Sequence, residues 1–196
     1  MTEQALPTDD LRADAVRNRT RVLEVARELL ETGDDTLPLN KVAKLAGIGV
    51  GTVYRHFPNR QVLLESLALG SFEKLLFEAQ AAADEEDPTV GLERLLRAAL
   101  TYQLGDAGLA AVSRSSENAC AETSELKRAT AAATNRLLEN AREAEVIRPD
   151  IDADDLRRLL CGFEVAVRLG VGDPAKNQAE IERYTAILLS GLRPTH

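Results

Sequence analysis

Apolar residues recur three and four positions apart along most of this chain, which is the spacing of one face of an α-helix. Between residues 10 and 31, for example, the apolar positions include Val22, Val25, Ala26, Leu29 and Leu30. No segment shows the alternation of β-branched and polar residues that a half-buried strand would show. The pattern therefore predicts an all-α chain in which each helix buries one face against its neighbours.

Capping residues and helix breakers divide this pattern into about nine helices. Asp87 followed by Pro88 is typical of a helix start, and so is Asp152 followed by further acidic residues. Gly33, Gly105 and Pro149 interrupt the pattern. We expect a loose tail over residues 1–9 and helices over about residues 10–31, 40–46, 50–57, 61–83, 88–104, 109–118, 122–145, 152–169 and 174–192.

Residues 39–60 predict two short helices joined by a tight turn. Asn40 is suited to cap the first helix, because its side chain can accept a hydrogen bond from an unpaired main-chain amide. Gly47 follows that helix directly, where a positive φ angle would end it. Two helices joined in this way form a helix-turn-helix, whose second helix can enter the major groove of DNA.

The second helix of this motif has an apolar inner face and a polar outer face. Val53 and Phe57 fall on the inner face, and the outer residues are Thr52, Tyr54, Arg55 and His56. The segment 40–60 also holds four basic residues and no acidic one, as expected of a surface that meets phosphate. These basic residues are Lys41, Lys44, Arg55 and Arg60.

The charge of the whole chain, −8, disfavours nucleic acid at first sight, but its distribution changes the conclusion. Residues 1–60 carry nine basic and nine acidic residues, whereas residues 61–196 carry fifteen and twenty-three. Because salt screens charges beyond about 8 Å, DNA would respond to the local field rather than to the total. The acidity lies outside the segment that we expect to bind DNA.

The motif resembles the TetR family of bacterial transcriptional regulators over residues 19–67. The resemblance is carried by Ala43-x-x-Ala46-Gly47-Ile48 and by the run from Gly51 to Arg60, GTVYRHFPNR. It implies a three-helix head over residues 10–60 and a helical body over residues 61–196 that binds a ligand and dimerises.

The resemblance also implies individual roles at the DNA surface. Thr52 and Tyr54 would bind phosphates, while Val50, Gly51 and Arg55 would lie near base edges. The full set of expected DNA-binding residues is Asn40, Lys44, Val50, Gly51, Thr52, Tyr54, Arg55, His56 and Arg60.

Two features depart from the family pattern. Gly49 stands where many relatives carry a serine or threonine that caps the recognition helix. Asp34 and Asp35 replace the usual glycine and aromatic residues before the motif, and the sequence gives no reason for these acids.

In relatives the body binds a small molecule between its helices, which changes the spacing of two DNA-reading heads. The candidate pocket residues here are Phe72, Leu76, Leu96, Leu100, Tyr102, Gln103, Arg114, Asn118 and Cys120. Resemblance also suggests that the last two helices pair with their copies in a homodimer. The expected interface residues are Leu156, Leu160, Phe163, Val167, Ile181, Tyr184, Leu188 and Leu192, although packing within one chain would need the same apolar pattern.

Other functions fit the sequence less well. The glycines at 47, 49 and 51 lack the spacing and the preceding strand of a dinucleotide-binding loop. With His56 and His196 as its two histidines, the chain shows no metal-ligand cluster, nucleophile motif or phosphate loop, so we expect no enzyme activity, metal or cofactor.

The predicted function is therefore a DNA-binding regulator, and the resemblance implies a repressor that is released from a palindromic operator by a small-molecule effector. The alternative is a helical homodimer that acts through protein–protein contacts without an inducer. The spacing of Cys120 and Cys161 does not indicate a disulfide, so we expect both to be reduced thiols. The sequence also shows no secretion signal and no long apolar run. We accordingly expect a cytoplasmic protein without membrane contact.

Overall fold

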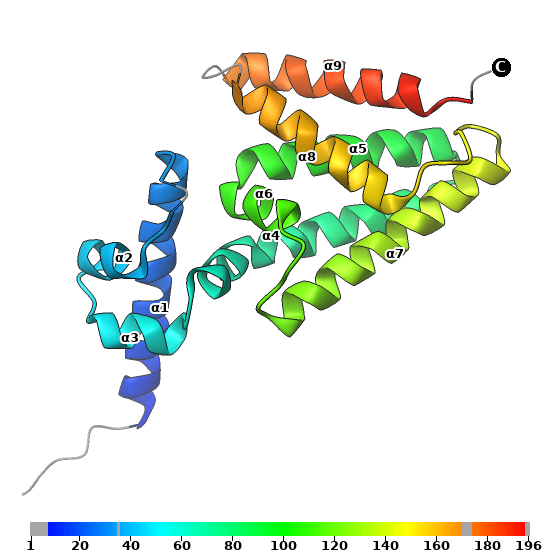
Figure 1. Ribbon diagram of the computed structural model, residues 1–196. Coiled ribbons are helices and arrows are strands. Elements are labelled where there is room, and N and C mark those ends of the chain that lie inside the picture. Colours follow the sequence, from blue (N-terminus) through cyan, green and yellow to red (C-terminus); the bar gives the residue numbers. More distant parts are fainter. Residues whose placement is uncertain (1–7, 35, 170–173, 195–196) are drawn as a thin grey trace, which may run out of the picture. The chain divides into compact units, whose positions relative to one another are not determined.

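The computed structural model describes residues 8–34, 36–169 and 174–194, and all regular secondary structure in these ranges is helical (Figure 1). The helices are α1 (Thr8–Glu31), α2 (Leu39–Ala46), α3 (Val50–His56), α4 (Arg60–Ala83), α5 (Pro88–Gly105), α6 (Ala107–Arg114), α7 (Ala121–Glu143), α8 (Ala153–Leu169) and α9 (Pro174–Leu192). The prediction of a tail over residues 1–9 is wrong at its end, because α1 already begins at Thr8. Residues 1–7 and the expected break at residues 170–173 lie outside the described residues.

The chain divides into two compact units between Leu67 and Ala68. The first unit contains α1, α2, α3 and the beginning of α4, and the second contains the rest of α4 and the later helices. The division expected at residue 60 falls where α4 begins, so the first unit includes more of that helix than we anticipated.

The first unit has a small apolar core at the crossing of its helices, because α1 contacts both α2 and α3. Each helix contributes the residues that its periodic pattern predicted. The core residues from these three helices include Val22, Val25, Ala26, Leu30, Leu39, Val42, Ala43 and Val53, with Phe57 directly after α3.

The turn between α2 and α3 has the conformation that its glycine predicted. Gly47 has a φ of 70° and a ψ of 25°, and the amide of Ile48 donates to the carbonyl oxygen of Ala43 over 3.0 Å. The prediction that Asn40 caps α2 is wrong. Pro38 occupies the cap position, since its fixed φ suits the residue before a helix, and Asn40 lies exposed in the first turn.

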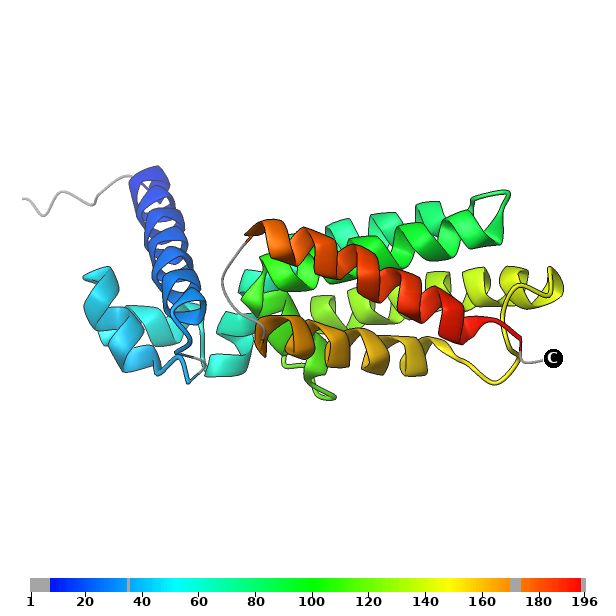
Figure 2. The same cartoon turned by 90° about the horizontal axis from the view of Figure 1, so that it is seen from above.

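In the second unit, α5 contacts α6, α7, α8 and α9 (Figure 2). Its residues Leu92, Leu95, Leu96, Ala99 and Leu100 are buried in a core to which α4, α7, α8 and α9 also contribute. This arrangement explains why the helices of this part carry broad apolar faces.

Two of the predicted helix caps are present. Asp87 Oδ1 accepts a 2.8 Å hydrogen bond from the amide of Thr89, and Asp152 Oδ1 accepts from the amides of Asp154 and Asp155. The helix expected over residues 109–118 instead ends at Arg114. It can end there because Lys127 of α7 donates to the carbonyl oxygens of Val112 and Ser115.

Candidate functional site

The outer face of α3 exposes the side chains that we expected to meet DNA. Val50 is 45% exposed and Tyr54 is 44% exposed, whereas Val53 and Phe57 are fully buried. Gly51 and Arg55 are exposed as well. This division follows from the helical period, because residues three and four apart share a face.

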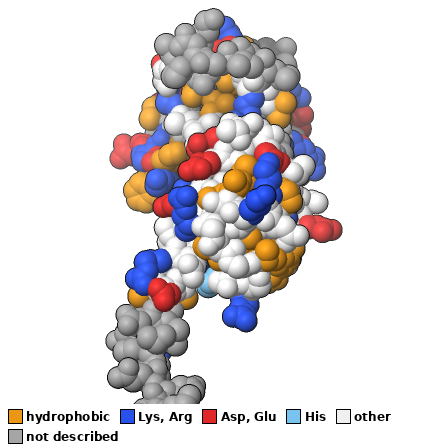
Figure 3. All heavy atoms as spheres, turned by 90° about the vertical axis from the view of Figure 1, so that its left-hand side faces the viewer, with side chains coloured by type: hydrophobic (Ala, Val, Ile, Leu, Met, Phe, Trp, Pro, Cys, Tyr) orange, Lys and Arg blue, Asp and Glu red, His pale blue; other side chains and the backbone are white. Residues whose placement is uncertain are grey.

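The remaining candidate DNA-binding residues surround this face. Asn40 and Lys44 on α2 and Arg60 at the start of α4 are exposed, and Thr52 and His56 are half-buried. All nine candidates are thus accessible from solvent to some degree, since none of them is buried. Figure 3 shows a face of the molecule on which basic side chains lie beside exposed hydrophobic ones.

The acidic segment before α2 has a local structural role. Asp34 Oδ2 accepts a 2.5 Å hydrogen bond from Lys41 Nζ, and Asp34 Oδ1 accepts one from the Thr36 hydroxyl. These bonds, with that of Lys41 the larger influence, lower the pKa of Asp34 to about 2. Asp34 therefore offsets the charge of Lys41, while Lys44 lies one turn further along the same helix.

Arg19 of α1 contacts the aromatic ring that directly follows α3. Its guanidinium carbon lies 5.5 Å from the centre of the Phe57 ring, a distance at which cation–π attraction operates. The contact fixes the end of α3 against α1.

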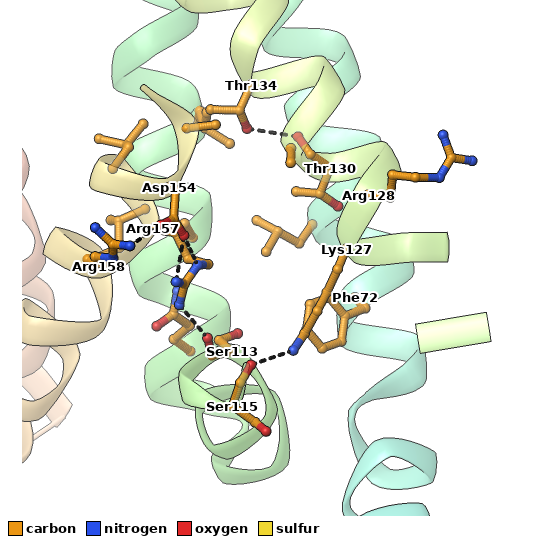
Figure 4. Close-up of a pocket in the computed structure, with 18 of the residues that line it drawn as sticks. Phe72, Ser113, Ser115, Lys127, Arg128, Thr130, Thr134, Asp154, Arg157 and Arg158 are labelled. Carbon is orange, nitrogen blue, oxygen red and sulfur yellow. Dashed lines mark hydrogen bonds and ion pairs between the residues drawn. The ribbon is translucent and has the colours of Figure 1, made fainter. Parts of the chain in front are cut away.

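The second unit contains a cavity of about 520 Å³ (Figure 4). Such a volume is within the usual range for small-molecule sites. The cavity is lined by residues of α4, α5, α7 and α8 and by the end of α6 with the residues that follow it. Of the expected pocket residues, Phe72 and Gln103 line it.

The other seven expected residues do not line this cavity. Leu96 and Leu100 are fully buried in the apolar core, and Arg114 instead forms a 2.6 Å ion pair with the buried Glu164. The remaining members are Leu76, Tyr102, Asn118 and Cys120. Periodicity shows which residues turn inward, but it does not separate those that face a cavity from those that face another side chain.

Sequence reasoning missed most of the lining, above all that from α7 and α8. These helices supply Lys127, Arg128, Thr130, Ala131, Thr134, Ala153, Asp154, Leu156, Arg157, Arg158 and Leu160. Leu156 and Leu160 had been expected at the dimer interface. No spacing signal in the sequence could have found these residues, because helices distant in sequence form the cavity jointly.

The expected dimer residues are largely buried within the single chain. Six of them are already buried in the single chain: Leu156, Leu160, Val167, Ile181, Leu188 and Leu192. The other two, Phe163 and Tyr184, are half-buried, and the centres of their rings lie 5.1 Å apart. A side chain already covered in the monomer adds no new area to an interface. The large apolar side chains that remain exposed on the described parts of α8 and α9 are Leu159, Val165 and Ile187.

The cysteines and possible metal ligands complete the inventory of reactive groups. Cys161 is buried and Cys120 is half-buried, and burial raises the pKa of the Cys161 thiol. Across the described ranges, no group of three or more histidine, cysteine, aspartate or glutamate residues is arranged to hold a metal ion. Within the same ranges, none of the helices combines the length and apolar character needed to cross a bilayer.

Both units match known protein families. Residues 22–67 match the bacterial regulatory proteins of the tetR family, and residues 87–194 match the C-terminal domain of SbtR-like transcriptional regulators. The chain belongs to the TetR family of transcriptional regulators. The second match covers more than half of the chain, so the assignment does not depend on the helix-turn-helix alone.

Individual relatives agree with this assignment. An HTH-type transcriptional regulator of Staphylococcus aureus is 44% identical over 54 residues, which are 27% of this chain and 29% of that protein. The chain thus aligns with less than a third of that relative's length. A TetR transcriptional regulator of Streptomyces coelicolor is 27% identical, with a TM-score of 0.54 and coverage of 91% of this chain and 99% of that one.

A third similar structure is RolR, solved in complex with the ligand resorcinol. It is 22% identical, with a TM-score of 0.57, and covers 93% of this chain and 91% of that one. At this identity it shows the shared fold alone. The family membership identifies a non-enzymatic class of protein, as the sequence predicted.

Proposed function

We propose that this TetR-family chain is a repressor that binds a palindromic operator as a homodimer and leaves it when a small molecule fills the cavity of the second unit. The single observation that carries the proposal is the division of α3. Tyr54, Val50 and Arg55 are exposed, while the residues that anchor the helix, Val53 and Phe57, are fully buried. A helix held in this way can present its outer face to the major groove.

The roles at the DNA surface follow from chemistry and exposure. Lys44 and Arg60 supply positive charge toward phosphates, and Thr52, Tyr54 and Asn40 supply neutral hydrogen-bond donors. Val50, Gly51 and Arg55 lie on the exposed face of α3, where side chains and bare backbone can approach base edges. His56, half-buried at the end of α3, is the remaining candidate contact.

The proposed dimer would use the outer faces of α8 and α9. Leu159, Val165 and Ile187 are between 41% and 50% exposed, and small residues such as Gly162 and Ala186 lie exposed beside them. Small residues allow helices to approach closely, and large apolar ones gain from leaving water. Two heads one DNA turn apart, about 34–36 Å, would then read a two-fold symmetric site.

The effector site is supported by the cavity and by the path of α4. Phe72 and Leu75 line the cavity, and the same helix begins at Arg60 in the DNA-binding unit. A ligand that prefers one position of α4 would shift the equilibrium between DNA-binding and released forms. RolR binds resorcinol, which illustrates that this fold can hold a small organic molecule.

The test is a gel-retardation assay with DNA from upstream of the protein's own gene, or with sites selected from a random pool. The protein should retard a symmetric site, and Tyr54→Ala should weaken retention while circular dichroism shows an intact fold. Substitution of Val50 or Arg55 should change the consensus that selection returns.

Failure to retard any fragment at low salt would overturn the proposal and favour a homodimer that acts through protein contacts. An unchanged consensus after both substitutions would show that the base-reading face is assigned wrongly.

A further inference from the structure

The buried side chains that line the cavity of the second unit are mostly apolar. The larger ones come from α4, α5 and α8 and are Phe72, Leu75, Leu95, Leu156 and Leu160. On α5, Gln103 follows Ala99 by four residues, and Ala99 follows Leu95 by four, and all three line the cavity. Because residues four apart share a face of a helix, Gln103 continues the face that α5 turns toward the cavity.

Gln103 carries a buried acceptor atom that has no donor. The residue is 2% exposed, and its Oε1 accepts no hydrogen bond from any residue that the structure describes. Its main chain is held in place, because Arg168 donates to its carbonyl oxygen over 2.9 Å. Buried polar atoms are nearly always paired in folded proteins. A ligand in this cavity that donates a hydrogen bond to Gln103 would therefore remove an energetic cost.

The charged residues that α8 contributes to the lining neutralise one another. Asp154 forms ion pairs with both Arg157 and Arg158, and Arg158 also lies 3.8 Å from Asp155. The side chains of the three lining residues are between 42% and 67% exposed, so water reaches them. They offer a ligand paired charges in the exposed part of the lining, whereas Gln103 belongs to its buried part.

The two cations that α7 contributes are also occupied. Arg128 pairs with Glu125, and in Figure 4 its guanidinium points away from the other labelled residues. Lys127 Nζ donates to the carbonyl oxygens of Val112 and Ser115 at 2.7 and 3.0 Å, where α6 ends. A charged ligand would lose its hydration here and would have to compete with these partners for an opposite charge, which is costly.

We propose that the effector is a neutral, largely apolar molecule with a hydroxyl group that binds Gln103. Its apolar body packs on the wall around Phe72 and Leu156, and its hydroxyl donates to Gln103 Oε1. Since a hydroxyl can also accept, the same group can pair with the amide nitrogen of Gln103. The assignment rests on the proposed function in taking this cavity as the effector site. It goes further by specifying the charge and the hydrogen-bonding group of the ligand.

The experiment compares four ligands that share a naphthalene ring, by calorimetry on the full-length protein. The ligands are naphthylmethanol, its methyl ether, the anion naphthoate and the cation naphthylmethylammonium. Naphthylmethanol should bind about two- to tenfold more tightly than its methyl ether, which lacks the donor, as expected for one neutral hydrogen bond. It should bind about tenfold or more tightly than either ion, because the charges of the lining are already paired.

The first variant assigns the preference for the hydroxyl to one residue. Gln103→Leu should bring the affinity ratio of alcohol to ether close to one. Gln80→Leu is the matched control, because Gln80 is an exposed glutamine of α4 outside the cavity lining, and it should leave the ratio unchanged. Each readout compares two ligands on one variant, so a general loss of stability does not imitate the effect.

The second variant tests why the anion is rejected. Asp154→Asn removes the carboxylate that pairs with Arg157, so naphthoate should gain affinity relative to naphthylmethanol by about threefold or more. Asp150→Asn is the matched control, because Asp150 is an exposed aspartate that pairs with Arg148 outside the lining. It should leave the ratio of the two ligands unchanged.

Equal binding of the alcohol and the ether would mean that water rather than the ligand pairs with Gln103, and it would overturn the inference. Tighter binding of either ion, an unchanged ratio in Gln103→Leu or Asp154→Asn, or no binding of the alcohol at millimolar concentration would do the same. Failure of the proposed function looks different. In that case the protein would show the predicted ligand ratios but would retain no DNA. A protein that binds its operator and is released by naphthoate alone would instead uphold the function and refute the neutral ligand.

Discussion

Gly91 of α5 lies directly against the main-chain carbonyl of Ala82 in α4. A Cβ atom at residue 91 would be 2.4 Å from Ala82 O and 2.9 Å from Leu137 Cδ1, closer than atoms can approach without displacement. Since the carbonyl belongs to the backbone, it cannot rotate away as the end of a side chain could. The absence of a side chain at Gly91 therefore sets how closely α4 and α5 pack.

Gly91→Ala should lower the free energy of unfolding by about 1–3 kcal/mol, the usual cost of overpacking. Gly70→Ala is the control, because Gly70 is an exposed helical residue of α4 and its added Cβ would meet nothing within 4 Å. That change should stabilise the protein by up to about 1 kcal/mol through helix propensity. Urea denaturation followed by circular dichroism measures both, and equal effects of the two changes would contradict the packing argument.

Glu145 has a φ of 57°, a left-handed conformation that favours glycine, and it follows the end of α7. Glu145→Gly should raise the free energy of unfolding by about 0.5–1 kcal/mol, because the left-handed strain exceeds the entropic cost of glycine. Gly47→Ala tests the same effect in reverse. Gly47 has a φ of 70° and its added Cβ would meet no atom within 4 Å, so a loss of about 1 kcal/mol would come from the backbone alone. In thermal unfolding, the melting temperature should rise for Glu145→Gly and fall for Gly47→Ala.

The Asp34–Lys41 pair should stabilise the first unit in a pH-dependent way. The pKa of Asp34 is lowered from 3.8 to about 2 in the folded chain, so folding favours the ionised carboxylate. Its stabilising contribution is therefore present above pH 3.8 and is lost as the pH falls toward about 2. Asp34→Asn should lower the melting temperature at neutral pH, and its difference from the unmodified protein should shrink in acid. Lys41→Met should show the same trend, and a difference that is constant with pH would refute the pairing.

Lys44→Ala should weaken binding to specific and non-specific DNA alike. Loss of one phosphate contact should reduce the slope of log affinity against log salt by about one. Lys74→Ala provides the control, because Lys74 is an exposed lysine of α4 in the second unit. Fluorescence anisotropy at several salt concentrations gives both slopes, and identical slopes would remove Lys44 from the phosphate-binding surface.

Ile187→Glu should convert the proposed homodimer into a monomer, because the charge would be buried opposite its own copy. Val90→Glu is the matched control, since Val90 on α5 and Ile187 on α9 are both 50% exposed. Light scattering coupled to gel filtration should report a halved mass for the first variant and an unchanged mass for the second. If both variants keep the mass of the unmodified protein, the dimer does not use this face of α9.

The amino-acid sequence by itself determined the helices, the turn at Gly47, the caps at Asp87 and Asp152, and the division of α3 into a buried and an exposed face. These features depend on residues within one or two helical turns, whose spacing and stereochemistry act locally. The family was also readable from the sequence, because its motif is a contiguous run from Ala43 to Arg60.

Only the tertiary structure decided which inward-facing residues border the cavity and which apolar residues of α8 and α9 stay exposed. Leu96 and Gln103 lie on the same helix and both face inward, but one is enclosed by side chains while the other borders a cavity. Leu37 likewise takes a φ of 39° and is fully buried, although nothing local favours that conformation for leucine. The reason is physical: a periodic pattern specifies the face that leaves water, whereas the partner of each residue on that face depends on how helices distant in sequence pack together.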